Sequence, residues 1–345
     1  MSLPFRVGLT RDFLKPDGSP GFGDIGLSLL DEDSRVDWKF LSERLDVIPQ
    51  SVADQFDALL VLAPQVTAET LDGCQRLTLV ARFGVGYDNV DVAACSRNNV
   101  LLTITPDGVR RPVAVSAITF LLALSHRLLI KDRLTRDGRW AEKLDHCGTG
   151  VTGRTLGLIG FGNIGREIAQ LAAPFDLHVV AADPFTTKEA AREAGVELLN
   201  LDTLLSTSDF VCVCCALTSE THHLLDAARL ALMKPSAFLI NVARGPIIDQ
   251  AALTEVLTNR RIAGAGLDVF EQEPVDPNDP ILKLDNVIVA PHAICWTDEL
   301  FLGNGQAACR SIIDVAHGRL PSGVVNRDAT ELPGIIEKLA RFACE

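Results

Sequence analysis

Three polar side chains with complementary chemistry each follow an apolar, strand-like run in the second half of the chain. Arg244 stands in NVARGPIID, Glu273 in GLDVFEQEP and His292 in VIVAPHA. The forked guanidinium of an arginine can hold a carboxylate and an adjacent carbonyl together, and an imidazole beside a carboxylate can donate or accept a proton near neutral pH. Arg244 taken alone would more often be a surface arginine in an ion pair. Because the carboxyl ends of parallel strands meet at one edge of a sheet, we expect the three residues to converge on a 2-keto or 2-hydroxy acid.

A glycine-rich turn, GFGNIG, connects an apolar run to a helix-like stretch. Gly160 permits a tight exit from the strand, Gly162 leaves room for a pyrophosphate, and Gly165 lets the following helix pack closely on the sheet. The N-terminus of that helix would face the anion. Asp183 ends the next strand, at the spacing of roughly twenty residues typical of dinucleotide-binding folds. Its carboxylate would accept hydrogen bonds from the adenosine ribose and repel a 2′-phosphate, which favours NAD over NADP.

Apolar runs with strand character alternate with helix-like stretches along the chain, a pattern that builds parallel sheets covered by helices. A long apolar helix over 112–130, beginning at Pro112, and a polar loop over 137–153 separate two such series. The strands that we expect are 6–10, 45–49, 58–62, 77–82 and 100–104 in the first series, and 156–160, 178–182, 210–215, 238–242, 263–269 and 287–291 in the second.

Composition narrows the class of partner. The formal net charge of −13 and the scattered Lys and Arg residues argue against a nucleic-acid partner. The N-terminal segment lacks an apolar signal core, and no uncharged stretch reaches the ~18 residues of a membrane span, so we expect a cytoplasmic protein without a membrane partner. The nine cysteines are an odd number, and Cys212, Cys214 and Cys215 fall in one apolar, strand-like run, where adjacent residues point to opposite faces. This pattern indicates reduced, buried thiols and no metal site.

Five motifs together closely resemble the NAD-dependent D-isomer-specific 2-hydroxyacid dehydrogenases, the family of phosphoglycerate dehydrogenases and glyoxylate/hydroxypyruvate reductases. The resemblance runs from about residue 45 to 327, and its carriers are FGVGYDNVD (83–91), GRTLGLIGFGNIGRE (153–167), NVARGPIID (241–249), GLDVFEQEP (266–274) and APH (290–292).

The resemblance implies a role for each motif. Arg244 would bind and polarise the substrate's carboxylate and carbonyl, His292 would exchange the proton, and Glu273 would hold His292 as a dyad. Backbone N–H groups of Val85 and Gly86 would bind the substrate carboxylate, since a glycine-rich loop lets an anion approach. The cofactor residues that we expect are Gly160, Gly162, Asn163, Ile164, Gly165, Asp183, Thr218, Ala243 and, in a supporting role, Asp268.

The family also explains why the glycine turn lies halfway along the chain. Its members insert the cofactor domain into a flavodoxin-like substrate domain, which here predicts two Rossmann-like α/β domains with doubly wound parallel sheets. The substrate domain would comprise residues 1–108 and 294–345, and the NAD-binding domain 109–293. The resemblance further implies an active site between the domains and a homodimer in contact through the arm near 130–153. Trp140 would be either an interface anchor on that arm or a core tryptophan.

Substrate identity stays open at this stage. Arg82, before FGVGYDN, matches an arginine of phosphoglycerate dehydrogenases, and Arg110 with Arg111 would add charge for a phosphate. Trp296, where relatives carry small residues, would either exclude long substrate side chains or serve ordinary packing between the domains. We therefore expect glyoxylate, hydroxypyruvate or 3-phosphoglycerate as substrate. An NADH-binding corepressor-like scaffold and a phosphite-type dehydrogenase of the same superfamily are the alternatives.

Overall fold

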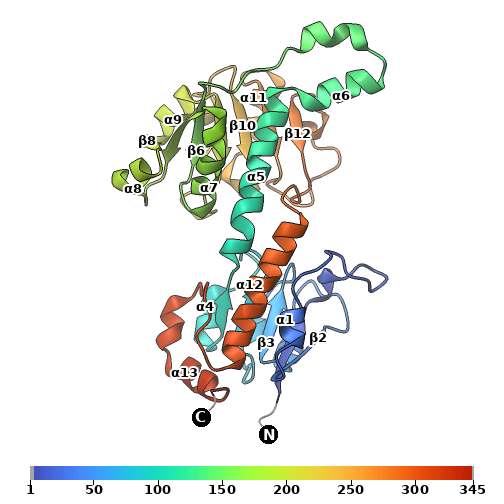
Figure 1. The fold of residues 1–345 in the computed structure, drawn as a ribbon, viewed down its shortest axis with the longest axis vertical. Coiled ribbons are helices and arrows are strands. Elements are labelled where there is room, and N and C mark those ends of the chain that lie inside the picture. Colours follow the sequence, from blue (N-terminus) through green and yellow to red (C-terminus); the bar gives the residue numbers. More distant parts are fainter. Residues whose placement is uncertain (1–3, 344–345) are drawn as a thin grey trace. The chain divides into compact units, whose positions relative to one another are not determined.

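The chain forms two compact units. The computed structural model describes residues 4–343. Unit 1 consists of the residues up to Val109 together with those from Trp296 onward, and unit 2 is Arg110–Cys295. The sequence-based boundaries fall after residues 108 and 293. Both units are α/β, with helices flanking a parallel sheet in each (Figure 1), and this confirms the predicted fold class.

Unit 1 contains a five-stranded parallel sheet in the order β2-β1-β3-β4-β5. Its strands are β1 (Phe5–Leu9), β2 (Val36–Phe40), β3 (Ala58–Val61), β4 (Leu79–Arg82) and β5 (Leu101–Thr103). The helices are α1 (Ser28–Asp31), α2 (Gln50–Ala53), α3 (Ala68–Leu71), α4 (Val92–Arg97), α12 (Asp298–Ala316) and α13 (Pro333–Ala340), with 3₁₀ turns at Arg11–Phe13 and Arg327–Glu331. α12, which begins after the Thr297 N-cap, packs on β4.

One predicted strand of this sheet is wrong. Residues 45–49 form only an isolated bridge, Val47 to Gln65. The second strand is instead β2, an edge strand whose exposed Asp37 and Lys39 alternate with half-buried residues. An edge strand can carry charged residues on its exposed side. The charged positions of β2 therefore resembled loop residues in the sequence, and the strand was not predicted.

Unit 2 contains a seven-stranded parallel sheet in the order β12-β11-β10-β9-β6-β7-β8. Its strands are β6 (Thr155–Ile159), β7 (His178–Ala182), β8 (Glu197–Leu198), β9 (Phe210–Val213), β10 (Phe238–Asn241), β11 (Gly264–Leu267) and β12 (Val287–Val289). Six of them were predicted, and β8, which has only two residues, was not. The helices include α7 (Asn163–Ala172), α8 (Lys188–Glu193), α9 (Leu201–Thr207), α10 (Ala227–Leu230) and α11 (Gln250–Thr258).

Both faces of the seven-stranded sheet are covered by apolar side chains. Along β9, Val211 and Val213 belong to one core cluster, whereas Phe210 and Cys212 belong to the other. Alternate residues of a strand point to opposite faces, so a strand buried on both sides needs an unbroken apolar run. Burial on both faces therefore explains the unbroken apolar runs from which these strands were predicted.

The predicted helix over 112–130 is two helices. α5 (Pro106–Ser125) begins six residues earlier, with Pro106 rather than Pro112 at its first position, and α6 (Leu128–Arg136) follows a break at Arg127, whose φ is 53°. α5 is long and apolar enough to cross a membrane by composition, but 61% of the apolar window is buried. Burial of this extent is typical of a core helix in a water-soluble protein.

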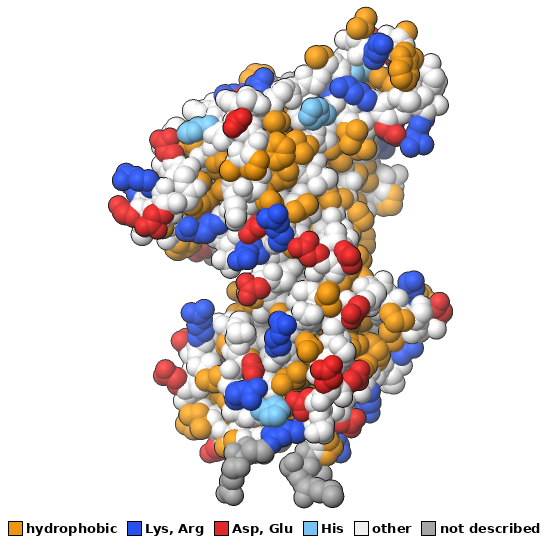
Figure 2. All heavy atoms as spheres, in the orientation of Figure 1, with side chains coloured by type: hydrophobic (Ala, Val, Ile, Leu, Met, Phe, Trp, Pro, Cys, Tyr) orange, Lys and Arg blue, Asp and Glu red, His pale blue; other side chains and the backbone are white. Residues whose placement is uncertain are grey.

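The polar loop that follows contains a 3₁₀ helix, Trp140–His146. Trp140 is 64% exposed, so the core alternative for this residue is wrong, and Lys143 Nζ lies 5.6 Å from the centre of its ring. On the face shown in Figure 2, Lys and Arg side chains are interspersed with Asp and Glu over both units.

Candidate active site

The glycine turn follows β6, where the order of the seven-stranded sheet reverses. β6 lies between β7 and β9, and open α/β sheets bind ligands at such a reversal. Gly160 has φ of 98°, and a Cβ at this position would lie 2.8 Å from Cys215 Cα. A Cβ on Gly165 would lie 2.6 Å from the Gly160 carbonyl oxygen, whereas around Gly162 the space is open for at least 4 Å. The turn therefore has the cradle that a pyrophosphate needs, at the N-terminus of α7.

Asp183 fastens this turn to the end of β7. Its Oδ2 accepts a hydrogen bond from Phe161 N at 2.7 Å, and its Oδ1 accepts from Phe185 N at 2.8 Å and Thr186 N at 3.1 Å. These three bonds fix the carboxylate next to the turn and leave acceptor capacity for a hydroxyl group. The position fits an adenosine ribose, which is what the sequence predicts.

Sulfur atoms line the other side of the turn. Cys214 Sγ donates to the Gly160 carbonyl at 3.1 Å, and its hydrogen bond with Cys212, together with burial, raises the pKa of the Cys214 thiol. A raised pKa keeps a thiol protonated and unreactive. All cysteines within residues 4–343 are free thiols, and no group of three or more His, Cys, Asp or Glu suited to a metal occurs there.

His292 and Glu273 form a hydrogen-bonded pair. His292 Nδ1 lies 2.7 Å from Glu273 Oε2, while Glu273 Oε1 accepts from Phe270 N at 3.0 Å. Burial alone would raise the pKa of Glu273, but the hydrogen bonds from His292 and Phe270 N, with the charges of His292 and Arg244, lower it below its ordinary value. The carboxylate therefore stays ionised. Its hydrogen bond to Nδ1 fixes the orientation of the His292 ring, so Nε2 is the ring nitrogen that is not bound to Glu273.

Arg244 follows β10, and its backbone is held on both sides. Asn241 Nδ2 donates to the Arg244 carbonyl at 3.0 Å, and a Cβ on Gly245 would come within 1.8 Å of the Phe270 carbonyl. The Arg244 side chain donates to the Ala243 carbonyl at 2.8 Å. The charge of Arg244 contributes to the lowering of the Glu273 pKa, after the larger effects of His292 and Phe270 N.

Asp268 fixes the turn that carries His292. Its buried Oδ1 accepts from Ala293 N at 2.9 Å and Ile294 N at 3.1 Å, and its carbonyl accepts from His292 N at 2.7 Å. His292 has φ of 55°, a left-handed conformation that a residue with a Cβ rarely adopts without such support. Burial raises the pKa of Asp268 more than these hydrogen bonds lower it. Sequence reasoning missed this positioning role, because only the fold brings the ends of β11 and β12 together.

The glycine turn, Arg244, Glu273 and His292 all lie in unit 2, and the sequence of this unit matches a known family. The model of the D-isomer specific 2-hydroxyacid dehydrogenase NAD-binding domain matches residues 118–293, about half of the chain. This chain belongs to the D-isomer specific 2-hydroxyacid dehydrogenases. It is an NAD-dependent oxidoreductase that acts on the CH–OH group of 2-hydroxy acids.

Individual relatives extend the similarity over most of the chain. The glyoxylate reductase of Korarchaeum cryptofilum is 36% identical over 312 residues, which cover 89% of this chain and 94% of that protein. A D-3-phosphoglycerate dehydrogenase of Archaeoglobus fulgidus is 36% identical over 81% of this chain but only 52% of its own length. The D-lactate dehydrogenase of Aquifex aeolicus, solved with NAD and lactic acid, is 26% identical with a TM-score of 0.78, covering 90% of this chain and 96% of that one.

The dehydrogenase's predicted substrate residues lie in unit 1. Arg82, at the end of β4, donates to the carbonyl of Phe83. Gly84 is held by Thr105, whose Oγ1 accepts from Gly84 N at 2.8 Å. Within residues 4–343, the N–H groups of Val85 and Gly86 donate to no protein acceptor. These two amides suit an anionic ligand.

Arg110 and Arg111 do not stand ready for a phosphate. Both pair with Glu167 of α7, Arg110 Nε at 3.3 Å and Arg111 Nη1 at 2.8 Å. The sequence could not show this pairing, because α5 and α7 meet only in the folded unit.

The remaining predicted cofactor residues lie around the same sheet edge. Asn163 and Ile164 begin α7, Thr218 follows β9 and Ala243 follows β10. Ala243 N donates to Asn241 Oδ1 at 3.0 Å, and Thr218 N to Thr221 Oγ1 at 2.7 Å. Asn241, which holds both Ala243 and Arg244, was not predicted, although its place at the end of an apolar run was a usable signal.

Proposed function

We propose that this dehydrogenase reduces small 2-keto acids through a single constellation formed by Arg244, Glu273 and His292. The observation that carries the proposal is the His292 Nδ1 to Glu273 Oε2 hydrogen bond of 2.7 Å, on a carboxylate whose other oxygen is fixed by Phe270 N. An imidazole held at Nδ1 by an ionised carboxylate is a proton donor at Nε2.

The residues around the glycine turn fit NADH. Gly162 leaves open space at the N-terminus of α7, and Asp183 is fixed beside the turn. We assign the pyrophosphate to Gly160, Gly162, Asn163, Ile164 and Gly165, and assign Asp183 to the ribose hydroxyls. Thr218, Ala243 and Asp268 complete the assignment along the same sheet edge.

The chain's own residues then have separate tasks. Arg244 holds the substrate's carboxylate and keto oxygen with its two donor edges, which polarises the carbonyl. His292 gives its Nε2 proton to the keto oxygen, and Glu273 stabilises the imidazolium before the transfer. NADH, held at the glycine turn, would supply the hydride that the keto carbon accepts. In the reverse direction, His292 accepts the hydroxyl proton.

Val85 and Gly86 of unit 1 supply further donors for the substrate carboxylate in this proposal. Relatives named glyoxylate reductase and D-3-phosphoglycerate dehydrogenase support glyoxylate, hydroxypyruvate or 3-phosphoglycerate as substrate. We further propose a cytoplasmic homodimer without nucleic-acid or membrane partners. The support for a dimer contact through the arm near 130–153 is the exposure of Trp140, 64%, and Leu144, 83%, on that arm.

The test is NADH oxidation by the purified protein with glyoxylate, hydroxypyruvate and phosphohydroxypyruvate, with phosphite and NAD⁺ in a parallel assay. We expect saturable turnover of at least one keto acid and none of phosphite. Tight NADH binding without turnover of any keto acid would favour a scaffold, and NAD⁺ reduction by phosphite would favour a phosphite-type enzyme.

A further inference from the structure

A buried threonine holds the loop that we assign to the substrate carboxylate. Thr105 follows β5; its Oγ1 accepts a hydrogen bond from Gly84 N at 2.8 Å, and its own N–H donates to the Gly84 carbonyl at 3.0 Å. Gly84, whose φ is 126°, is thus bonded to one residue through both of its backbone groups. Because Gly84 directly precedes Val85 and Gly86, Thr105 fixes the start of the segment that carries these two amides.

Asn304 of α12 determines the direction of the Thr105 hydroxyl. Thr105 Oγ1 donates to Asn304 Oδ1 at 2.8 Å, and both side chains are buried. A hydroxyl group has one proton and two lone pairs. Because the proton is used by Asn304, the lone pairs of Oγ1 are left for Gly84 N. A chain of buried hydrogen bonds therefore connects α12 to the substrate loop.

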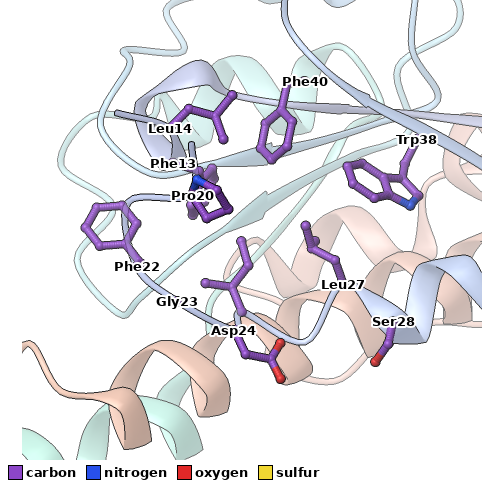
Figure 3. A pocket seen from close by; sticks show the side chains of 11 residues that line it. Phe13, Leu14, Pro20, Phe22, Gly23, Asp24, Leu27, Ser28, Trp38 and Phe40 are labelled. Carbon is purple, nitrogen blue, oxygen red and sulfur yellow. The ribbon is translucent and has the colours of Figure 1, made fainter. Parts of the chain in front are cut away.

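The segment of α12 around Asn304 is held by close backbone contacts. A Cβ on Gly108 would lie 2.5 Å from Asn304 N, and a Cβ on Gly305 would overlap the Ile25 carbonyl. Ile25 belongs to the stretch that lines the apolar pocket in Figure 3, a cavity of about 260 Å³. All of these residues lie in unit 1. Since there is no room for even a methyl group at either glycine, Asn304 is fixed in position.

The far end of the substrate loop has a separate anchor. Asn89 Nδ2 donates to the Pro64 carbonyl at 2.8 Å. Between the anchors at Gly84 and Asn89, the N–H groups of Val85 and Gly86 have no protein acceptor in the described part of the chain. The loop is therefore fixed at both ends while these two amides stay available to a ligand, which is the condition for preorganised anion binding.

We propose that Thr105 and Asn304 are positioning residues for the substrate. Acting through Gly84, they hold the amides of Val85 and Gly86 in the arrangement that binds the carboxylate of the acid. This inference rests on the proposed function. The carboxylate keeps its charge throughout the reduction, so its hydrogen bonds to the loop are equally strong in the bound substrate and in the transition state. Loss of such bonds raises KM and leaves kcat unaltered.

The experiment compares Thr105→Val and Thr105→Ser with the wild type in the NADH-dependent reduction of glyoxylate and hydroxypyruvate. Valine lacks the hydroxyl, so Gly84 N and Asn304 Oδ1 both lose their partner. We expect KM for both acids to rise about tenfold, with kcat and the NADH dissociation constant within about twofold of the wild type. Serine keeps the hydroxyl and should restore most of the affinity. The inhibition constant of oxamate, which offers the same carboxylate and is not reduced, should change in parallel with KM.

Thr78→Val is the matched control. Thr78 is also buried, and its Oγ1 donates to the Arg76 carbonyl at 3.2 Å, but it precedes β4 and so lies at the opposite edge of the sheet from the loop. We expect both valine variants to lower Tm, because each loses a buried hydrogen bond. Only Thr105→Val should raise KM.

Asn304→Ala tests the other end of the chain of hydrogen bonds, and it serves as the test if Thr105→Val does not fold. Without its acceptor the Thr105 hydroxyl can rotate, so we expect KM to rise about threefold. If Asn304 acts through Thr105, the double variant should have a KM no higher than that of Thr105→Val alone.

Several results would overturn the inference while the proposed function stands. These are a normal KM in Thr105→Val or Asn304→Ala, an equal rise in Thr105→Ser or Thr78→Val, and a loss of kcat larger than the rise in KM. Failure of the wild type to reduce any keto acid would overturn the proposed function and this inference with it.

Discussion

The carboxyl ends of the two sheets carry different kinds of side chain. The seven-stranded sheet ends in ionisable and hydrogen-bonding groups, with Asp183 after β7, Arg244 after β10 and His292 after β12. The five-stranded sheet ends beside aromatic rings, and the Arg82 guanidinium there is turned onto its own loop. In both units the parallel sheet brings the loops after its strands to one edge. The two edges therefore differ in function only because their residue types differ. In our account the first edge performs proton transfer and cofactor binding, and the second offers the amides of Val85 and Gly86 to an anion.

His292→Ala tests the first edge most severely. Loss of the proton donor should lower kcat for glyoxylate reduction by roughly 10²- to 10⁴-fold, with NADH affinity unchanged. The comparison predicts the same factor for every accepted keto acid, since the keto oxygen is common to all. Steady-state kinetics and fluorescence titration of NADH would check both quantities, and near-normal turnover would refute the assignment.

Arg244→Lys keeps the charge but loses the fork. We expect kcat/KM to fall by roughly 10²-fold for all keto acids, because one ammonium cannot hold the carboxylate and the keto oxygen together. The measurement is kcat/KM for two acids of different size. An unchanged value would move the carboxylate site away from β10.

Glu273→Gln tests the pH behaviour of the pair. The pKa of Glu273 is lowered in the folded protein, so its contribution is complete above the ordinary value of 4.5 and is lost only as the pH falls below it. Glutamine removes the charge of Glu273 and keeps an oxygen acceptor, so kcat for reduction should fall about tenfold, and the loss of kcat that the wild type shows on acidification below 4.5 should be absent from the variant. An acid limb of the same shape in both proteins would show that Glu273 is not the group that sets it.

Asp268→Ala and Asp268→Asn separate support of the turn from cofactor binding. Asparagine retains an oxygen acceptor for Ala293 N and Ile294 N, whereas alanine leaves both amides without one. We expect kcat to fall about fivefold in the alanine variant and less in the asparagine variant, with the NADH dissociation constant little changed. Weakened NADH binding with unchanged kcat would assign Asp268 to the cofactor alone.

Asp183→Ala should have the smallest effect on the reaction itself. Removal of the carboxylate takes away the repulsion of a 2′-phosphate, so the preference for NADH over NADPH should relax by about fivefold, while the ratio between keto acids stays constant. Initial rates with both cofactors would check this. An unaltered cofactor preference would mean that another residue contacts the ribose.

Much of unit 2 could be predicted because its signals are local. Strands buried on both faces read as unbroken apolar runs, and the three glycines of the turn are each demanded by a close approach or by space for a ligand. β2 was missed because an edge strand tolerates Asp37 and Lys39. The break at Arg127 was missed because no glycine or proline marks it.

In the site, too, residues marked by a local sequence pattern could be predicted, and residues that act through long-range contacts could not. Arg244, Glu273 and His292 were visible as chemical types after strand-like runs. The support given by Asp268, Asn241 and the Glu167 pair with Arg110 depends on contacts between elements far apart in the chain, and no local pattern records them.

The central claim is that the His292–Glu273 pair transfers the proton to the keto oxygen of any accepted acid. The most direct test is kcat/KM for glyoxylate and for 4-methyl-2-oxopentanoate, measured in the wild type and in His292→Ala. Our account predicts much lower values for both acids in His292→Ala, with the ratio between them unchanged. Near-normal values, or a loss confined to one acid, would contradict it.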